Sequence, residues 1–176
     1  MALPDSSTQS TTPHETLADG AMTQADARNA IESLLYGYAE RMDEGDFAGV
    51  AELFERGRIL DPNGGILATG REEVQAVYER STKLYPDGTP RTQHVTTNLV
   101  LSFGESGQTA AAHSRFTVMQ SLPDFPLQCI ITGQYDDEFV YDLSQPDLGW
   151  YFTQRQMKPR LVGDLSRHLT FDLASA

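Results

Sequence analysis

Two polar residues that interrupt apolar patterns, Asp43 and His94, are the strongest candidates for chemistry in this sequence. The spacing of apolar residues predicts that Asp43 ends an amphipathic helix and that His94 lies near the start of a strand. An aspartate that orients a histidine makes a general base able to work near neutral pH. The two residues therefore predict an acid–base site, provided that the fold brings them together.

Simpler interpretations of both residues remain open. Asp43 can belong to a solvated helix end, where Glu44 and Asp46 would complete an acidic patch. His94 can lie on the solvent side of a half-buried strand or be a hydrogen-bonded core histidine. In a regular strand, the face of His94 also carries Thr96 and Asn98, and the opposite face carries Val95, Thr97, Leu99 and Leu101.

The elements expected to position Asp43 are helices in the first half of the chain. Thr23 can cap a helix that carries apolar residues at helical spacing and stops at Gly45. Asp46 then caps a short helix through Phe54, and residues 59–67 predict a hairpin that turns at Asn63-Gly64. A third helix opens with the capping pattern of residues 69–72 and runs towards Leu84.

Four long strand-like runs follow, at residues 92–103, 108–120, 127–141 and 149–159. Runs of this length favour a strongly curved or bulged antiparallel sheet. Helices followed by such a sheet predict an α+β domain. Residues 1–22 lack periodicity and are expected to form a mobile tail, residues 23–169 the single domain, and residues 170–176 a C-terminal tail.

Composition excludes several classes of function. The net charge of −12, without a Lys/Arg cluster, argues against a nucleic-acid partner. No run approaches a membrane span, and the N-terminus lacks a signal-peptide pattern, so we expect a cytoplasmic protein without membrane contact. The only cysteine, Cys129, lies in an apolar run that predicts a small core residue. The histidines lack metal-ligand spacing and no nucleotide-binding motif is present, so neither a metal nor another cofactor is expected.

Four local strings, in this order and spacing, resemble the SnoaL-like branch of the nuclear transport factor 2-like superfamily. They are Ala30-Ile31-Glu32 leading to Asp43, Thr92-Gln93-His94 followed by Asn98, Gly133-Gln134-Tyr135-Asp136-Asp137, and Gln154-Arg155-Gln156-Met157. The resemblance covers roughly residues 23–169. It implies a cone of about three N-terminal helices packed on a strongly curved, mixed or antiparallel sheet around an apolar pocket.

Within that superfamily the pattern is similar to hexachlorocyclohexane dehydrochlorinase, scytalone dehydratase and bile acid dehydratase, which eliminate HX or water without a cofactor. The resemblance assigns catalytic roles to Asp43, His94, Tyr38 and Arg155. This sequence departs from the scytalone dehydratase pattern at two positions. The second pocket histidine of that enzyme falls near Met119, and its tyrosine next to the catalytic aspartate falls on Met42. The substrate pocket is expected to contain Tyr36, Asn98, His113, Met119 and Phe116.

The function expected from these residues is that of a cofactor-independent lyase or isomerase acting on a hydrophobic cyclic, polyketide-like or steroid-like small molecule. His94 would abstract a proton, Asp43 would orient it, and Tyr38 or Arg155 would assist a leaving group or oxyanion. The alternative is a non-catalytic binding or accessory module, such as the small subunit of a ring-hydroxylating dioxygenase. We also expect a homodimer or homotrimer, since Ile131, Phe139 and Phe152 would need cover on the outer face of the sheet.

Overall fold

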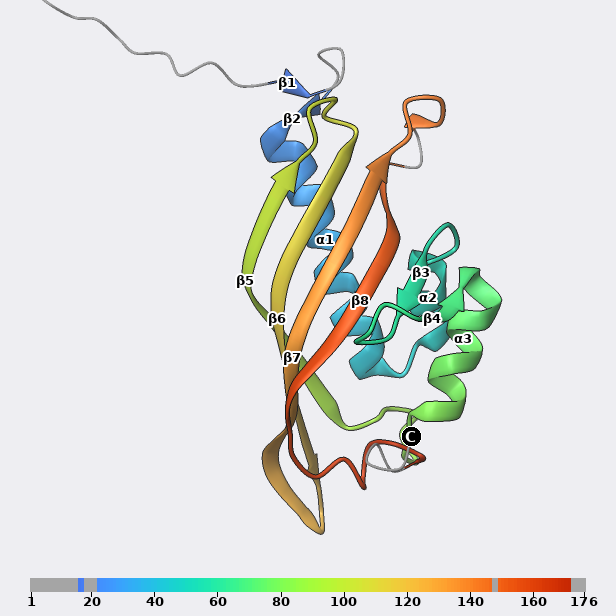
Figure 1. Ribbon diagram of the computed structural model, residues 1–176. Helices are drawn as coiled ribbons and strands as arrows, with labels where there is room; N and C mark the ends of the chain where they lie inside the picture. Colours follow the sequence, from blue (N-terminus) through green and yellow to red (C-terminus); the bar gives the residue numbers. More distant parts are fainter. Residues whose placement is uncertain (1–15, 18–21, 147–148, 172–176) are drawn as a thin grey trace, which may run out of the picture.

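The computed structural model describes residues 16–17, 22–146 and 149–171 (Figure 1). Of the expected N-terminal tail, only the short strands β1 (Thr16–Leu17) and β2 (Met22–Thr23) are described, and they pair with each other. Of the expected C-terminal tail, only Thr170 and Phe171 are described. The remaining residues of both expected tails lie outside the described ranges.

Helix α1 (Gln24–Glu44) is the long helix that carries Asp43 in its last turn. Thr23 and Asp26 form a reciprocal capping box at its start, and Gly45 ends it in the left-handed conformation at φ 74°. The buried face repeats at helical spacing, with Ala27, Ile31, Leu35, Tyr38, Ala39 and Met42. This face packs against the sheet and sets the direction in which the end of the helix points.

Two shorter helices, α2 (Phe47–Leu53) and α3 (Gly70–Ser81), flank the hairpin of β3 (Arg58–Leu60) and β4 (Ile66–Thr69). The predicted cap of the third helix differs in detail: the Thr69 side chain makes no capping hydrogen bond, whereas Glu73 accepts one from the Thr69 amide. The helix also stops at Ser81 rather than near Leu84. Thr82 is extended there and forms a bridge with Leu169.

The sheet has six strands in the order β4-β3-β8-β7-β6-β5. Strands β5 (Thr92–Phe103), β6 (Thr109–Leu122), β7 (Phe125–Tyr141) and β8 (Trp150–Val162) form an antiparallel meander, and β3 joins β8 in parallel. The sheet is therefore mixed, which is one of the two arrangements that the resemblance implied. Figure 1 shows these long strands curving across α1, with α2 and α3 to one side.

A bulge in β5 changes which side chains face the interior. The register with β6 shifts between Thr97 and Val100, and Asn98 adopts a left-handed φ of 54°. Before the bulge His94 is opposite buried Val118, and after it Leu101 is opposite buried Ala112. His94 and Leu101 therefore share the inner face, and the regular alternation predicted from the sequence is wrong beyond Thr97.

The sides predicted for four apolar residues were wrong. Phe139 and Phe152 are 1% and 0% exposed and belong to the core of the single chain, and Ile131 is partly buried against that core. Cys129 is exposed, because a register irregularity in β7 places its neighbour Ile130 inside instead. Ile131, Phe139 and Phe152 therefore give no reason to expect a homo-oligomer. Other apolar side chains, such as Leu127 and Leu161, are exposed and could be covered by a second copy.

Candidate active site

The structure brings Asp43 and His94 into direct contact at the end of α1. The Asp43 Oδ1 and His94 Nδ1 atoms are 2.5 Å apart, and Asp43 Oδ2 accepts a 2.7 Å hydrogen bond from the backbone amide of His94. The Thr92 hydroxyl donates to Asp43 Oδ1 over 2.8 Å. The carboxylate thus clamps the first residues of β5 and fixes the plane of the imidazole ring.

Electrostatics favour an ionised Asp43. Burial alone would raise the pKa of Asp43, but the hydrogen bonds and charge of His94, together with Thr92, outweigh it and hold the pKa below its usual value. Because a carboxylate can only accept, His94 Nδ1 carries the proton of this contact. The neutral ring then has its lone pair on Nε2, which makes no hydrogen bond with any described residue.

The His94 side chain is only 7% exposed, so the pair is not a solvated surface feature. Across the sheet, His94 is opposite Val118 and Thr96 is opposite Phe116, both of which are buried. Phe116 stacks on Tyr135 with ring centroids 4.4 Å apart. The imidazole therefore lies beside an apolar, aromatic part of the interior.

A buried ion pair lies further along the same interior. Arg155 donates to both oxygens of Asp137 over 2.7 and 2.8 Å, and both side chains are almost fully inaccessible. The guanidinium lies 4.1 Å from the ring centroid of Tyr38 and 4.0 Å from that of Tyr135. Its third nitrogen, Nη1, is buried and makes no hydrogen bond with any described residue, so one cationic donor group remains free.

Tyr38 joins this ion pair to the helix that carries Asp43. Its hydroxyl is 2.8 Å from the hydroxyl of Tyr78 on α3. Five residues on one helix span about 7.5 Å, so Tyr38 lies roughly that far along α1 from Asp43. Burial raises the pKa of Tyr78, which therefore keeps its hydroxyl proton. Tyr38 and Arg155, two of the catalytic residues implied by the resemblance, thus come together in the core.

The five predicted pocket residues divide between two sides of the protein. Phe116 is buried on the inner face. Tyr36 is 49% exposed on α1, and Asn98 is exposed at the bulge. His113 and Met119 alternate with buried residues of β6 and lie on the outer face. The prediction that Tyr36, Asn98, His113 and Met119 line the interior with His94 was therefore wrong. A strand with alternating side chains and an amphipathic helix each turn only one face towards the core.

His113 instead belongs to a polar cluster on the outer face of the sheet. Its Nδ1 is 2.7 Å from Asp136 Oδ1, and Lys158 lies 2.6 Å from the other oxygen of Asp136. The His113 side chain is 43% exposed. This second His–Asp contact also joins Nδ1 to a carboxylate oxygen, but its carboxylate is shared with Lys158 and Gln134 and it faces away from the core.

Sequence reasoning missed several buried polar residues of the interior. Ser114, Gln120 and His168 each carry a buried polar atom without a hydrogen bond to any described residue, and Asp137 is the partner of Arg155. The signal available for Ser114 and Gln120 was their even spacing with Phe116 on one strand. His168 carried no signal, because it follows the last strand in an irregular segment.

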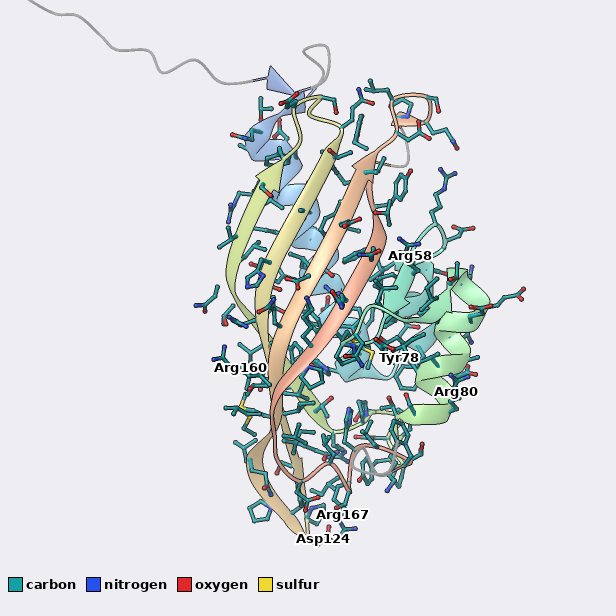
Figure 2. The ribbon with its side chains drawn as sticks, in the orientation of Figure 1. Arg58, Tyr78, Arg80, Asp124, Arg160 and Arg167 are labelled. Atoms are coloured by element: carbon teal, nitrogen blue, oxygen red, sulfur yellow. The ribbon has the colours of Figure 1, made fainter. Side chains whose placement is uncertain are left out.

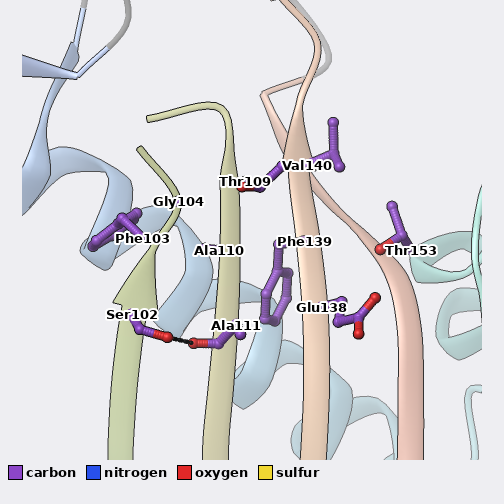
Figure 3. Close-up of a pocket in the computed structure, with 10 residues that line it drawn as sticks. All are labelled: Ser102, Phe103, Gly104, Thr109, Ala110, Ala111, Glu138, Phe139, Val140 and Thr153. Carbon is purple, nitrogen blue, oxygen red and sulfur yellow. Dashed lines mark hydrogen bonds between the residues drawn. The ribbon is translucent and has the colours of Figure 1, made fainter. Parts of the chain in front are cut away.

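A separate hollow of about 350 Å³ lies at the opposite end of the strands (Figure 3). Its lining includes exposed residues such as Ala111 and Glu138, and neither Asp43 nor His94 takes part. Among the residues described, no group of His, Cys, Asp and Glu has the arrangement of a metal site. None of the described helices has the length and apolar character needed to cross a membrane.

Comparison with known proteins supports the fold. Residues 23–156 match the family model of the SnoaL-like domain. Among curated proteins, no sequence matches significantly. A cystatin-like-fold protein from Nostoc punctiforme superposes with a TM-score of 0.63 at 19% identity, covering 86% of this chain and 99% of that one.

Two further solved structures are similar at the level of the fold. A candidate scytalone dehydratase from Novosphingobium aromaticivorans has 22% identity and a TM-score of 0.61, covering 80% of this chain and 91% of that one. LinA has 18% identity and a TM-score of 0.60, with coverage of 81% and 92%. Because the family model covers more than half of the sequence, this chain belongs to the SnoaL-like family.

Proposed function

We propose that this protein is a cofactor-independent lyase or isomerase in which His94 is the general base and Asp43 orients it. The observation that carries the proposal is the double contact of the Asp43 carboxylate with the ring and the backbone amide of His94. That contact leaves the basic Nε2 atom beside the aromatic interior. Hydrophobic cyclic molecules with an acidic C–H bond are the substrates that such a site suits.

In an elimination, His94 Nε2 takes a proton from carbon and the C–H electron pair forms the new double bond. The leaving group departs from the neighbouring carbon with the electrons of its own bond. In an isomerisation, the same electron pair forms an enolate, and the proton returns to a different carbon. In both cases the imidazole becomes a cation, which the ionised Asp43 stabilises.

Arg155 is suited to the negative charge that develops on the substrate. Its guanidinium is held in place by Asp137 and by the rings of Tyr38 and Tyr135, and its buried Nη1 still has protons to donate. A fixed cationic donor in a dry site stabilises an oxyanion or departing anion more than the same donor in water. We assign this role to Arg155 rather than to Tyr38, whose hydroxyl already bonds Tyr78.

Proton abstraction can be tested without knowing the natural substrate. The protein is incubated with 1-tetralone or 2-tetralone in D₂O, and deuterium at the carbon next to the carbonyl is followed by mass spectrometry. We expect exchange above the buffer rate, a loss of at least about 100-fold in His94→Ala, and a smaller but clear loss in Asp43→Asn.

The outer-face histidine provides a matched control. His113→Ala removes an imidazole that also contacts an aspartate, and it should exchange at the unaltered rate. Equal rates in the natural protein, His94→Ala and His113→Ala would refute the general-base proposal. The accessory-module alternative would then be favoured, and pull-down with a partner subunit would become the relevant assay.

A further inference from the structure

The C-terminal segment, residues 163–171, crosses the end of the interior at which Asp43 and His94 lie. It is bound to the residues after α3: the Lys83 amide donates to the His168 carbonyl over 2.8 Å, and the Tyr85 hydroxyl donates to the Arg167 carbonyl over 2.6 Å. Arg167 also pairs with Asp124 at the turn between β6 and β7. Figure 2 shows these two residues together at the lower end of the molecule.

Gln120 connects this segment to the Asp43–His94 pair. It lies on the inner face of β6 opposite Thr92, the residue whose hydroxyl binds Asp43. Its Nε2 atom donates to the carbonyls of Pro90 and Arg167 over 3.0 and 3.2 Å. A reversed amide would place its oxygen against two other oxygens, so these bonds fix the orientation. Gln120 Oε1 is therefore a buried acceptor, and no described residue donates to it.

His168 supplies a second free polar atom at the same end. The residue is 8% exposed, and its Nδ1 is buried without a hydrogen bond to any described residue. It directly follows Arg167, whose carbonyl Gln120 binds. Burial lowers the pKa of His168 to about 4, His94 acts in the same direction, and Asp43 acts against both. His168 is thus a neutral imidazole close enough to the pair to sense its charges.

We propose that Gln120 and His168 bind a hydroxyl group of the substrate beside the Asp43–His94 pair. A hydroxyl both donates and accepts, so it can donate to Gln120 Oε1 while it accepts from His168 Nδ1. An ether or a hydrocarbon at this position would leave the buried Gln120 acceptor unsatisfied, which disfavours binding. This inference rests on the proposed function for its site and specifies the substrate class, a cyclic compound with a free hydroxyl.

The test compares two probes that differ only in that group, 2-indanol and 2-methoxyindane. Dissociation constants are measured by titrating the full-length ¹⁵N-labelled protein and following amide shifts. We expect 2-indanol to bind about threefold to tenfold more tightly than the ether, as for one or two neutral hydrogen bonds. Neither probe has a C–H bond acidified by a carbonyl, so the result does not depend on proton abstraction, and failure of the exchange assay would leave it interpretable.

Variants then identify the residue responsible. His168→Phe keeps the ring and should remove the preference for the alcohol, whereas His168→Asn places a polar atom near the position of Nδ1 and should retain part of it. His113→Phe on the outer face should change neither dissociation constant. If alcohol and ether bind equally to the natural protein, if neither binds, or if His168→Phe weakens both equally, the proposal is wrong. The comparison on the natural protein decides the matter even if His168→Phe fails to fold.

Discussion

Removing one partner of the buried ion pair between Arg155 and Asp137 should lower the free energy of unfolding far more than replacing both partners with apolar residues. Asp137→Asn leaves a guanidinium without its counter-charge in a site where Arg155 and Asp137 are 1% and 0% exposed. Removing one partner of such a pair costs about 3–5 kcal/mol of unfolding free energy. For a domain of this size that corresponds to a Tm lowered by roughly 6–20 °C.

Replacing both partners should cost much less. The double variant Asp137→Leu with Arg155→Met removes two buried charges and keeps apolar volume, so we expect a free energy of unfolding within about 2 kcal/mol of the natural protein. Arg155→Met alone leaves the carboxyl unpaired. Burial raises the pKa of Asp137, so this variant should be least impaired near pH 4 and lose stability as pH rises above the unfolded pKa of about 3.9.

The assay is urea unfolding, followed by circular dichroism at several pH values, of Asp137→Asn and of the cycle formed by the natural protein, Asp137→Leu, Arg155→Met and the double variant. Arg28→Met provides the control, because Arg28 contacts Glu32 over 2.7 Å but is 48% exposed, and its loss should cost less than about 1 kcal/mol. If Asp137→Asn costs no more than Arg28→Met, or if the double variant loses the sum of both single losses, the account of Arg155 as a desolvated cation is refuted.

Further predictions concern the candidate site and its frame. Asp43→Asn should lower the free energy of unfolding at neutral pH, because the ionised carboxylate stabilises the folded state. The difference from the natural protein should shrink as the pH falls through the lowered pKa of Asp43, and urea unfolding at pH 7 and pH 3 would measure it. NMR titration should find His168 neutral down to about pH 4. His168→Phe should raise the free energy of unfolding between pH 6.5 and pH 4, because in that range His168 is protonated in the unfolded chain but not in the folded chain, which destabilises the folded natural protein. Gly133→Ala should cost about 1–3 kcal/mol in thermal unfolding, because its Cβ would meet a neighbouring carbonyl and a phenyl ring. Light scattering at micromolar concentration should show a dimer or trimer that Leu161→Glu weakens, since Leu161 is 67% exposed.

The helices and the succession of the four long strands along the chain could be predicted because their signals are local, whereas the parallel pairing of β3 with β8 has no local signal. The cap at Thr23, the stop at Gly45 and the apolar stripe through Tyr38 each depend on neighbouring residues, and the structure has α1 within a residue of those limits. The contact of Asp43 with His94 required an additional step, since 51 residues separate them along the chain. Only the resemblance to a known family indicated that they should meet.

The rest depended on features without a local signal. The bulge at Asn98 reverses the alternation of β5, so the faces assigned to Leu99 and Leu101 from periodicity were wrong. Cys129 was placed on the wrong side because the register of β7 with β6 shifts beside it. Phe139 lies in a regularly alternating stretch, and periodicity alone does not say which of its two faces packs against the helices. The position of His168 depends on hydrogen bonds from segments far away in the sequence, which no periodic pattern encodes.

The bulge in β5 also has a consequence for how this strand tolerates insertions and deletions. Thr97 is opposite Arg115 and Val100 is opposite His113, so β5 carries one residue more than β6 at this point, and deleting Asn98 would remove that extra residue and leave Leu99 opposite the buried Ser114. With His94 held by Asp43, both halves of the strand would then keep their facing, and Leu99 and Leu101 would stay inside. Deleting a residue from a regular part of the strand, such as Ser102, would instead exchange inside for outside on one side of the deletion, much as a frameshift acts on a coding sequence. A one-residue deletion is therefore expected to be tolerated at the bulge and to be harmful in the regular parts of this strand.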